Sequence, residues 1–576
     1  MKIKNTSIGK DNIDQTITLE GWVSKIRNLG NLIFIDLRDR SGIIQLKINN
    51  DSKAFSIAST LKNEFVVKAS GVVVLRDKPN SNLVTGDIEV EVDGLEVLNE
   101  SKELPFDLNN MTALEDTRLK YRYLDLRRDD LKNNLIVKHK IMQAARSYLN
   151  DNDFIEIETP ILCKSTPEGA RDYLVPSRIN RGSFYALPQS PQIFKQLLMV
   201  GGFEKYYQMA RCFRDEDLRA DRQPEFTQID LEMSYGSEED IISLTEGMLS
   251  KIFKEVKGID IKLPIDRMTY EEAISRYGSD KPDTRFGMEI KDITEAFKNT
   301  DFELFKNVIL DGGIINAIVV KNKADSFSRK DIDKLTEFVK IYKACSLAFL
   351  KYSNEFTGSI AKFVNEEVAN YLLDKLKLEA NDLVLIAYGD KKIVKNSLGF
   401  LRLKLGKDLN LIDDNKFNFL WITDFPLFEY SEEENRYIAC HHPFTQPQDI
   451  KSLGDKENAK ARAYDIVLNG YEIGGGSIRI HDINMQENVL EALGFNKEKA
   501  YEQFGFLLEA LSLGAPPHGG LALGLERITM ILCGTDNIRD VIAFPKTASA
   551  ADLMSSSPSG VSDKQLDELG INLKKV

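Results

Sequence analysis

The first hundred residues contain short segments in which apolar and polar positions alternate, or apolar residues cluster between turn residues. These segments are residues 16–23, 31–39, 42–49, 65–76 and 86–98. Because successive side chains of a strand point to opposite faces, this pattern predicts about five β-strands bounded by Gly, Asn and Asp. Five strands in so short a stretch fit either a sandwich or an OB barrel.

The pattern changes after this β-rich region. Residues 101–130 are polar and predict a linker, and residues 135–152 have the apolar spacing of a helix. Residues 154–162 predict a strand closed by Pro160, after which helices and strands mix.

Residues 285–415 differ again, because lysine is frequent, glycine is sparse, and helical segments alternate with strands such as 315–320 and 382–388. This composition and this alternation of helices and strands predict an α/β domain inserted into another domain. The expected divisions are 1–103 for the β-domain, 104–135 for a hinge or linker, 136–284 and 416–558 for two parts of one domain, 285–415 for the insertion, and 559–576 for a charged C-terminal extension.

Composition places the chain among ordinary globular proteins, with 576 residues, 42% apolar and 29% charged. The five cysteines are odd in number, far apart and without a CxxC pair, which argues against a disulfide framework or a clustered zinc site. The polar N-terminus and the lack of a long apolar run predict neither a signal peptide nor a membrane span. We therefore expect a cytoplasmic protein.

The net charge of −13 is weak evidence against a nucleic-acid partner, because binding depends on local patches. One basic cluster exists, made of Arg118, Lys120, Arg122, Arg127 and Arg128. Without other evidence, the favoured interpretation of such a run is a solvated helix face.

Arg214 and Glu216 lie in the segment FRDE, whose flanking residues predict a strand with both side chains on one face. A guanidinium there can hold a phosphate or a carboxylate with two hydrogen bonds. Residues 225–233 predict a second strand that pairs back antiparallel. The alternative for an isolated RxE is a salt-bridged surface hairpin.

Gly520 and Gly524 precede Glu526, Arg527 and an apolar helix. The glycines allow a ligand to approach the backbone, and Arg527 at a helix start could reach a phosphate. The alternative is a glycine-rich turn before a packing helix.

Asp465 and Glu472 bracket a strand and a turn, and GGGS and Arg479 follow. Their oxygens suit Mg²⁺, although two isolated acids are usually surface residues. His441 and His442 are adjacent, so on a strand they would face opposite sides and at most one would enter a pocket.

The order and spacing of these segments resemble the three motifs of class II aminoacyl-tRNA synthetases. TPEGARDY, LPQSPQIFKQ, CFRDEDLRADRQPEFTQID, HHPFT and NGYEIGGGSIRIH closely resemble bacterial aspartyl-tRNA synthetases. Residues 21–45 resemble their OB anticodon-binding domain, and 285–415 their inserted GAD domain. The resemblance implies an α+β multidomain protein with an N-terminal OB barrel, an antiparallel-sheet catalytic core and an α/β GAD-type insertion. Two departures are an insertion poorer in glycine at residues 342–352 and GLER where GLDR is also common.

The resemblance also implies residue roles. Arg214 would grip the α-phosphate of ATP and the substrate carboxylate, Arg527 the γ-phosphate, and Asp465 and Glu472 would hold Mg²⁺, with Arg214, Arg527 and Glu472 as the catalytic groups. The other ATP-site residues would be Asp215, Glu216, Gln223, Gly524, Leu525 and Glu526. Lys195 and Arg479 would bind the aspartate side chain, with Glu168, Ser190, Gln192, Asp230 and one histidine, preferably His441, around its amino and carboxylate groups.

In the barrel, the resemblance implies anticodon contacts by Arg27, Leu29, Phe34 and Gln45. Phe34 would stack on a base, Gln45 would bond a base edge and Arg27 a phosphate, whereas the alternative is that Phe34 belongs to the barrel core. In the family, a histidine near the loop containing Leu29 accompanies enzymes that also charge tRNA(Asn). No histidine occurs in the first 138 residues, which favours tRNA(Asp) alone.

The expected partners are tRNA(Asp), L-aspartate and a second copy of the chain, with no DNA and no membrane. Two competing interpretations are a synthetase for asparagine or lysine, and an OB-fold nucleic-acid-binding protein with a degenerate catalytic domain. Lys195, Arg479 and the insertion argue against the first interpretation. The second is disfavoured by five intact site residues, Arg214, Glu216, Asp465, Glu472 and Arg527.

Overall fold

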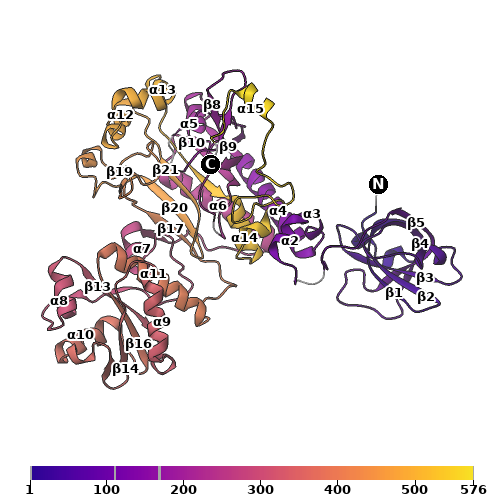
Figure 1. Cartoon of the computed structure of the whole chain (residues 1–576), viewed down its shortest axis with the longest axis horizontal. Coiled ribbons are helices and arrows are strands. Elements are labelled where there is room, and N and C mark those ends of the chain that lie inside the picture. Colours follow the sequence, from indigo (N-terminus) through magenta and orange to yellow (C-terminus); the bar gives the residue numbers. More distant parts are fainter. Residues whose placement is uncertain (1–2, 109–111, 167–169, 219, 575–576) are drawn as a thin grey trace. The chain divides into compact units, whose positions relative to one another are not determined.

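The structure is a computed structural model that describes residues 3–108, 112–166, 170–218 and 220–574. The chain forms two compact units, Met1–Thr117 and Arg118–Val576 (Figure 1). Among the described residues, no helix combines the length and the apolar character that crossing a membrane requires.

The first unit is a closed five-stranded barrel with strand order β1-β2-β3-β5-β4. Its elements are β1 (Thr16–Asn28), β2 (Leu32–Arg38), β3 (Ile43–Asn49), α1 (Phe55–Ala58), β4 (Val66–Leu75) and β5 (Ile88–Asn99). Alternate residues such as Leu19, Ile35 and Leu46 point inward and are fully buried. The predicted strands are therefore confirmed, and they close into an OB barrel rather than a sandwich.

The second unit is built on an eight-stranded sheet with order β11-β17-β20-β21-β22-β10-β9-β6. These strands are β6 (Ile155–Glu156), β9 (Lys205–Phe213), β10 (Glu225–Ser234), β11 (Arg267–Thr269), β17 (Phe419–Thr423), β20 (Ala463–Leu468), β21 (Tyr471–Ile478) and β22 (His518–Gly524). The inner pairs are antiparallel and only the two edge pairs, β6–β9 and β11–β17, are parallel. The expected antiparallel core is confirmed, although β6 is much shorter than the strand predicted for residues 154–162.

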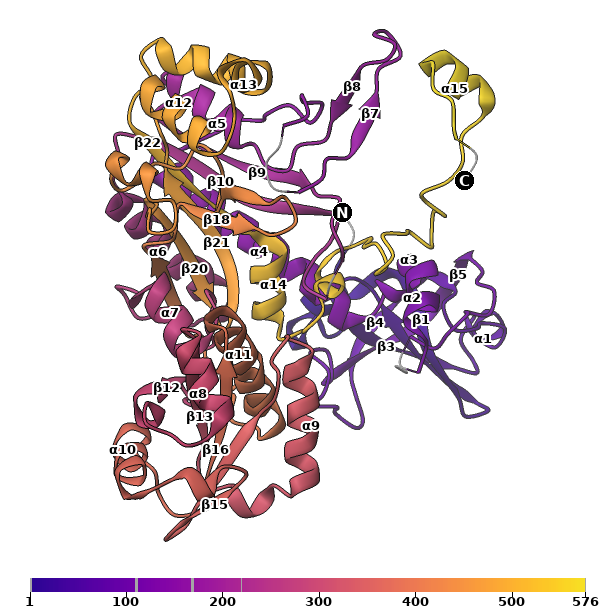
Figure 2. The ribbon, with the colours of Figure 1, turned by 60° about the vertical axis from the view of Figure 1, so that its left-hand side comes forward.

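Helices on the sheet bury its apolar side chains. The helices of this core are α4 (Asp129–Asp151), α5 (Gln192–Val200), α6 (Glu238–Lys257), α7 (Tyr270–Tyr277), α12 (Ile483–Ala492), α13 (Lys497–Ser512) and α14 (Leu525–Cys533). Side chains of α4, α6 and α14, including Ile141, Phe253 and Ile528, share one buried cluster with strand residues such as Trp421 and Leu523. The remaining elements are the hairpins β7 (Leu174–Pro176) with β8 (Phe184–Ala186) and β18 (Phe428–Ser431) with β19 (Arg436–Ala439), and α15 (Asp563–Leu569); Figure 2 shows the first hairpin projecting from the sheet.

The basic cluster before the core is not a solvated helix face. It spans α2 (Glu115–Lys120) and α3 (Arg122–Asp125), where the fully buried Asp125 carboxylate accepts hydrogen bonds from Arg118, Arg122 and Arg128. The Arg122 guanidinium also donates to the backbone carbonyls of Arg539, Ile542 and Ala543. The Asp125 carboxylate thus holds three arginines together, and Arg122 links this segment to a distant part of the chain.

Between β11 and β17 the chain forms a second, separate antiparallel sheet with order β12-β13-β16-β14-β15. Its elements are β12 (Lys291–Asp292), α8 (Glu303–Leu310), β13 (Ile314–Val320), α9 (Arg329–Lys340), β14 (Ala348–Tyr352), β15 (Phe356–Gly358), α10 (Glu366–Leu376), β16 (Asp382–Gly389) and α11 (Lys391–Asp408). Two apolar clusters surround this sheet, which is the architecture expected of an inserted α/β domain.

Arg402 of α11 joins the inserted sheet to the segment that enters it. Its guanidinium lies 3.9 Å from the ring centre of Phe286 and 4.9 Å from that of Tyr277. It also donates to the carbonyls of Phe286 at 2.7 Å and Gly287 at 2.8 Å. Arg402 is 1% exposed, so it acts as a buried clamp rather than as a surface cation.

Candidate active site

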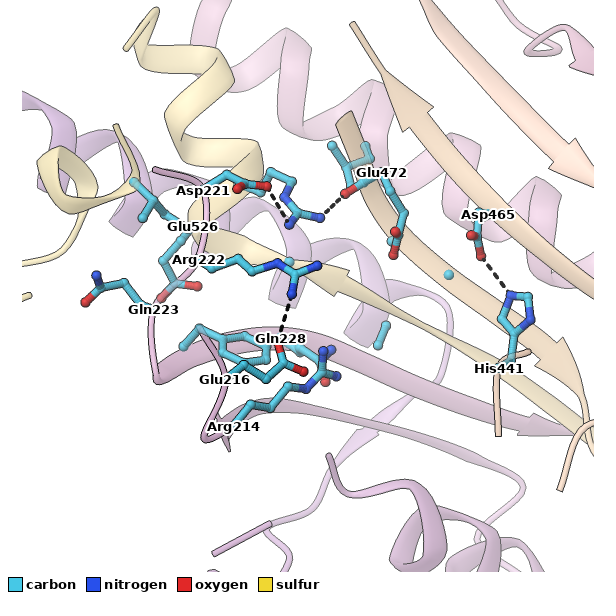
Figure 3. A pocket seen from close by; sticks show the side chains of 18 of the residues that line it. Arg214, Glu216, Asp221, Arg222, Gln223, Gln228, His441, Asp465, Glu472 and Glu526 are labelled. Carbon is cyan, nitrogen blue, oxygen red and sulfur yellow. Dashed lines mark hydrogen bonds and ion pairs between the residues drawn. The ribbon is translucent and has the colours of Figure 1, made fainter. Parts of the chain in front are cut away.

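A cavity of about 470 Å³ opens at the middle of the eight-stranded sheet (Figure 3). Its lining comes from the β9–β10 connection, from β20, β21 and β22, from the start of α14 and from residues 440–442. Segments that are far apart in sequence therefore meet at this cavity, and most of their polar side chains are charged.

Arg214 and Glu216 both line the cavity but lie just after β9, so the strand alternation predicted for them is wrong. The Arg214 backbone N–H donates to Pro224, which closes the β9–β10 turn. Its guanidinium lies 5.1 Å from the ring centre of Phe226, and its buried Nε has no hydrogen-bond partner among the described residues. Glu216 instead accepts from Arg222 at 2.9 Å, so Arg214 is free to receive an anion.

Arg527 lines the cavity from α14. Its Nη1 donates to the Glu472 carbonyl at 2.5 Å and its Nη2 to Asp221 at 3.3 Å, while the buried Nε has no partner among the described residues. Arg214 and Arg527 thus bring two fixed positive charges to one cavity from different elements. Such a pair suits a polyanion, because guanidinium groups bind phosphates with directional hydrogen bonds.

The residues next to Arg527 are fixed in place by packing and hydrogen bonds inside the protein. Leu525 is fully buried in the main core, and Gly524, at the end of β22, lines the cavity. The Glu526 carboxylate is 2% exposed and accepts from Lys138 Nζ at 2.7 Å and from the Thr227 N–H at 2.9 Å. Both Glu526 oxygens are therefore engaged inside the protein, although the residue reaches the cavity wall.

Gln223 and Asp215 also make internal contacts. The Gln223 side chain exchanges hydrogen bonds with the backbone of Lys546, at 2.8 and 3.1 Å, and lines the cavity. Asp215 pairs its backbone with Arg171 and is not part of the cavity lining that the structure describes. Of the predicted ATP-site residues, Asp215 and Leu525 therefore lie outside the wall of the cavity.

Asp465 of β20 and Glu472 of β21 face the cavity together. A Cβ on Gly475 would lie 2.4 Å from Asp465 Oδ1, so the GGGS segment leaves room for this carboxylate. Burial raises the pKa of Asp465 to about 6. Burial would lower the pKa of His441, but the hydrogen bond to Asp465, at 3.4 Å, outweighs it and raises this pKa to about 10.

A divalent cation bound by Asp465 and Glu472 would need further ligands from water or from a substrate. Among the described residues, no group of three His, Cys, Asp or Glu side chains is placed to hold a metal ion. Two carboxylates at the wall of an open cavity fit Mg²⁺, which keeps waters and binds substrate phosphates alongside one or two protein oxygens.

A second polar cluster is buried among α5, β10 and the end of β21. Lys195 Nζ lies 2.7 Å from Asp230 and 3.3 Å from Glu232, and Arg479 Nε lies 2.9 Å from Glu232. Burial raises the pKa of Asp230; it would also raise that of Glu232, but Arg479 and Lys195 outweigh it and lower the Glu232 pKa. Asp230 Oδ2 has no hydrogen-bond partner among the described residues, so the cluster retains one buried acceptor for a ligand.

Glu232 belongs to this cluster, although it was not among the site residues predicted from the sequence. Asp230 and Glu232 are two residues apart on β10, so strand alternation puts both carboxylates on one face of a central strand. A Cβ on Gly520 would lie 2.0 Å from Glu232 Oε2, which shows why β22 has a glycine opposite this acid. The sequence signal that could have identified Glu232 was this pair of acids, which alternate with apolar residues on the predicted strand.

His441 and His442 follow β19 in a bend, and both line the cavity. The prediction that at most one of them would enter a pocket is therefore wrong. His442 Nε2 accepts a hydrogen bond from Arg479 Nη1 at 2.8 Å, and burial lowers its pKa well below the ordinary value. His441 contacts Asp465 instead. The structure therefore brings His442, rather than the preferred His441, to the Lys195–Arg479 cluster.

Of the remaining predicted aspartate-site residues, Ser190 Oγ accepts from the Gln192 N–H at 3.3 Å just before α5. Gln192 and Lys195 are one helical turn apart on the same face of α5, which places Gln192 beside the buried cluster. Glu168 lies outside the described residues.

In the barrel, Phe34 is half-buried and does not belong to the core cluster. The Arg27 guanidinium lies 5.7 Å from its ring centre and donates to Gln45 Oε1 at 2.7 Å. Gln45 is 5% exposed and also accepts from Arg76 at 2.6 Å, while Leu29 is 69% exposed. Arg27, Phe34 and Gln45 form one connected group in which Gln45 is buried, so Gln45 would have to exchange a partner to contact a base.

Comparison with known proteins places both units. Residues 114–548 match the family described as tRNA synthetases class II (D, K and N), and residues 17–98 match the OB-fold nucleic acid binding domain. The chain is 56% identical over 570 residues to aspartate–tRNA ligase of Macrococcus caseolyticus, covering 97% of this chain and 96% of that protein. It is 57% identical over 566 residues to the aspartate–tRNA(Asp/Asn) ligase of a Geobacillus strain, covering 97% and 95%.

Solved structures share the fold at low identity. An asparaginyl-tRNA synthetase from Pyrococcus horikoshii, complexed with asparaginyl-adenylate, superposes with a TM-score of 0.60 at 19% identity, covering 95% of this chain and 98% of that one. The aspartyl-tRNA synthetase of Entamoeba histolytica gives a TM-score of 0.58 at 20% identity, covering 95% and 91%.

Proposed function

Because the chain belongs to the class II tRNA synthetases for aspartate, lysine and asparagine, we propose that its central cavity is where aspartate is activated with ATP. The protein is a ligase of protein biosynthesis that joins aspartate to tRNA(Asp), with ATP, aspartate and tRNA as substrates. The observation that supports this site best is the pair of cavity arginines, Arg214 and Arg527, each with a buried Nε that has no hydrogen-bond partner among the described residues.

The first reaction needs no general base, because the α-carboxylate of aspartate is already a nucleophile. A carboxylate oxygen attacks the α-phosphorus of ATP, the bond to the bridging oxygen breaks, and pyrophosphate leaves with its electron pair. The barrier lies in bringing two anions together and in the negative charge that grows at phosphorus. In the proposed arrangement, Arg214 holds the carboxylate and the α-phosphate in line, and Arg527 holds the γ-phosphate.

The second reaction moves the aspartyl group to tRNA. A terminal ribose hydroxyl of the tRNA attacks the activated carbonyl carbon, AMP leaves, and the hydroxyl proton is released. The proposed Mg²⁺ would be held by Asp465 and Glu472, and when bound it would neutralise charge on the phosphates.

We further propose that the Lys195–Arg479 cluster selects aspartate. Asp230 and Glu232 already balance the charges of Lys195 and Arg479. A substrate carboxylate can therefore bind only to a guanidinium N–H edge that neither acid occupies. Glu232 occupies Nε and Nη2 of Arg479, whereas Nη1 points to the neutral His442 and to Ser477. Nη1 is therefore the edge assigned to the aspartate side chain, because a carboxylate oxygen accepts from it whereas the N–H₂ end of a neutral amide does not.

Exposed apolar residues support the proposal that the protein forms a homodimer. Ile155, Leu162, Leu174 and Phe184 are 50%, 52%, 57% and 49% exposed along β6, the segment after it and the β7–β8 hairpin. A patch of this kind on a folded unit indicates an interface, and a second copy is the proposed cover. Sedimentation velocity should give about twice the mass of one chain, and a single-chain mass at micromolar concentration would exclude this proposal.

The domain divisions given above, and a cytoplasmic location, are parts of the same proposal. The barrel would read the anticodon through Arg27, Leu29, Phe34 and Gln45. We keep the preference for tRNA(Asp) alone, although relatives with names of both kinds match equally well. Aminoacylation of transcripts of tRNA(Asp) and tRNA(Asn) under one set of conditions decides it, since comparable rates would overturn the preference.

Exchange of radiolabelled pyrophosphate into ATP tests the activation site directly. We expect exchange that depends on aspartate, with much lower rates for asparagine and lysine. Faster exchange with asparagine or lysine would assign the site to another member of the family. No exchange with any of the three, together with intact tRNA binding, would instead support a binding protein without catalysis.

A further inference from the structure

A chain of buried hydrogen bonds runs from Gln192 to the backbone at the start of β22. Gln192 Nε2 donates to Gln196 Oε1 at 3.2 Å, and Gln196 Nε2 lies 3.3 Å from His518 Nε2. His518 Nδ1 lies 2.7 Å from the Pro516 carbonyl oxygen. Gln196 and His518 are fully buried, and neither one lines the cavity.

The Pro516 carbonyl fixes the direction of every hydrogen bond in this chain. A carbonyl oxygen only accepts, so His518 Nδ1 must carry the proton. Burial lowers the pKa of His518, which is therefore neutral and has an unprotonated Nε2. That nitrogen accepts from Gln196 Nε2, which turns Gln196 Oε1 toward Gln192 and makes it the acceptor for the Gln192 amide N–H.

Gln192 is consequently held with its carbonyl oxygen outward. Its Nε2 donates to Gln196, so its Oε1 lies on the other side of the amide group and makes no hydrogen bond among the described residues. Gln192 shares a helix face with Lys195, whose ammonium contacts Asp230 and Glu232 in the proposed aspartate cluster. A carbonyl oxygen on this helix face can accept from a cationic N–H group, whereas the amide N–H₂ in its place could not.

We infer that Gln196 and His518 are positioning residues, which lock the Gln192 amide so that its carbonyl oxygen receives the α-ammonium group of aspartate. This inference rests on the proposed function, because it takes the Lys195–Arg479 cluster as the aspartate site. It assigns a role to two side chains that do not touch the substrate themselves.

The test is a double-mutant cycle on aspartate-dependent pyrophosphate exchange. Gln196→Met keeps the side-chain volume and removes both polar atoms, so it should raise the KM for aspartate about 3- to 30-fold, the scale of one hydrogen bond to a charged group. The KM for ATP and kcat should change much less. Gln192→Met should raise the KM for aspartate at least as much, and adding Gln196→Met to it should have no further effect.

Two further variants keep the test decisive. Gln196→Glu retains an acceptor for Gln192 Nε2 and, with one proton shared between its carboxyl group and His518 Nε2, also retains the second hydrogen bond, so it should keep the KM for aspartate close to that of the unmodified protein. His518→Leu removes the acceptor for Gln196 and should raise the same KM; it takes the place of Gln196→Met in the cycle if that variant does not fold. Thr245→Val is the matched control, because its buried hydroxyl bonds only to Ile241 of its own helix, α6.

The possible failures are distinguishable. Additive effects of the Gln192 and Gln196 substitutions, or an equal rise in both KM values, would assign Gln196 a merely structural role and overturn the inference. A Gln196→Met protein that melts like the Thr245→Val control with an unchanged KM for aspartate would also overturn it. Absence of aspartate-dependent exchange in the unmodified protein would overturn the proposed function, and this inference with it.

Discussion

Arg214 and Arg527 illustrate how single side chains are prepared for a polyanion. Each is positioned by contacts to neighbouring residues, Arg214 against the Phe226 ring and Arg527 through the Glu472 carbonyl, and each keeps a buried Nε without a described partner. Unpartnered buried donors are costly in a folded protein, so their presence at one cavity is best explained by a ligand that satisfies them.

We predict that Arg214→Ala lowers aspartate-dependent pyrophosphate exchange by about two orders of magnitude or more, the scale of losing one donor that stabilises developing charge. The fold should persist, because no hydrogen bond or ion pair of the described residues depends on this guanidinium. Arg211→Ala is the control, since Arg211 lies near the end of β9, three residues before Arg214, and pairs with Glu225 at an exposed position. Exchange of Arg214→Ala at the level of this control would remove Arg214 from the site.

Arg479 should be needed both for selectivity and for charge balance. Arg479→Leu should lower kcat/KM for aspartate by orders of magnitude and reduce its preference over asparagine, and it should also lower the melting temperature, because Glu232 loses a buried partner. Adding Glu232→Gln should recover the melting temperature but not the preference. Unchanged discrimination between the two amino acids in Arg479→Leu would place the aspartate pocket elsewhere.

The resemblance of short motifs indicated nine of the residues that line the cavity, and local pattern alone indicated few. Strand alternation failed for Arg214 and for the two histidines, because these residues lie in turns whose course depends on packing against other segments. Glu232 was missed because its partners, Lys195 and Arg479, come from elements far away in sequence. Such contacts follow only from the arrangement of the sheet.

At the scale of elements, local patterns located the five barrel strands and both strands of the β9–β10 hairpin. They could not give the order of the sheet, in which β22 lies between β10 and β21. The basic run near residue 120 shows the same limit. Its sequence alone fits a solvated helix, and only the buried Asp125 and the carbonyls near residue 540 determine that it packs inward.

The clamp formed by Arg402 gives a prediction at this scale. Burial lowers the pKa of Arg402 to about 10, so its guanidinium is charged at neutral pH and depends on the Phe286 and Gly287 carbonyls and on two aromatic rings. Arg402→Met should lower the free energy of unfolding of the inserted region by about 2–4 kcal/mol. Urea titration followed by limited proteolysis measures this loss.

Arg329→Met is the control for the Arg402 variant, because Arg329 is an exposed residue at the start of α9. We expect its urea midpoint to equal that of the unmodified protein. If Arg402→Met also unfolds at that midpoint, the guanidinium contributes no net stability and the clamp is only a contact.

At the scale of the whole molecule, the proposed activation site and the proposed anticodon surface belong to separate compact units. The barrel has its own closed sheet and core, and the cavity is built entirely within Arg118–Val576. Changes to the outer surface of the barrel should therefore alter tRNA charging without altering the activation of aspartate.

Phe34→Ala tests this separation. Removing one ring that stacks on a base should weaken tRNA aminoacylation by about 1–3 kcal/mol in kcat/KM and leave pyrophosphate exchange unchanged. Leu75→Ala, at an exposed apolar position elsewhere on the barrel, should change neither activity. A loss of both activities, with a lower melting temperature, would instead indicate that Phe34 supports the barrel.

The position of β22 has a consequence for how the protein is made. A ribosome releases β9 and β10 long before β22, so the growing chain carries β10 with an open edge while all of the inserted domain is synthesised. The inserted sheet, complete at Gly389, is able to form during this interval, whereas the half-sheet beside it has no partner. Because an unpaired strand edge is a template for wrong pairing, aggregation of nascent chains should concentrate in this interval and end when His518–Gly524 emerges.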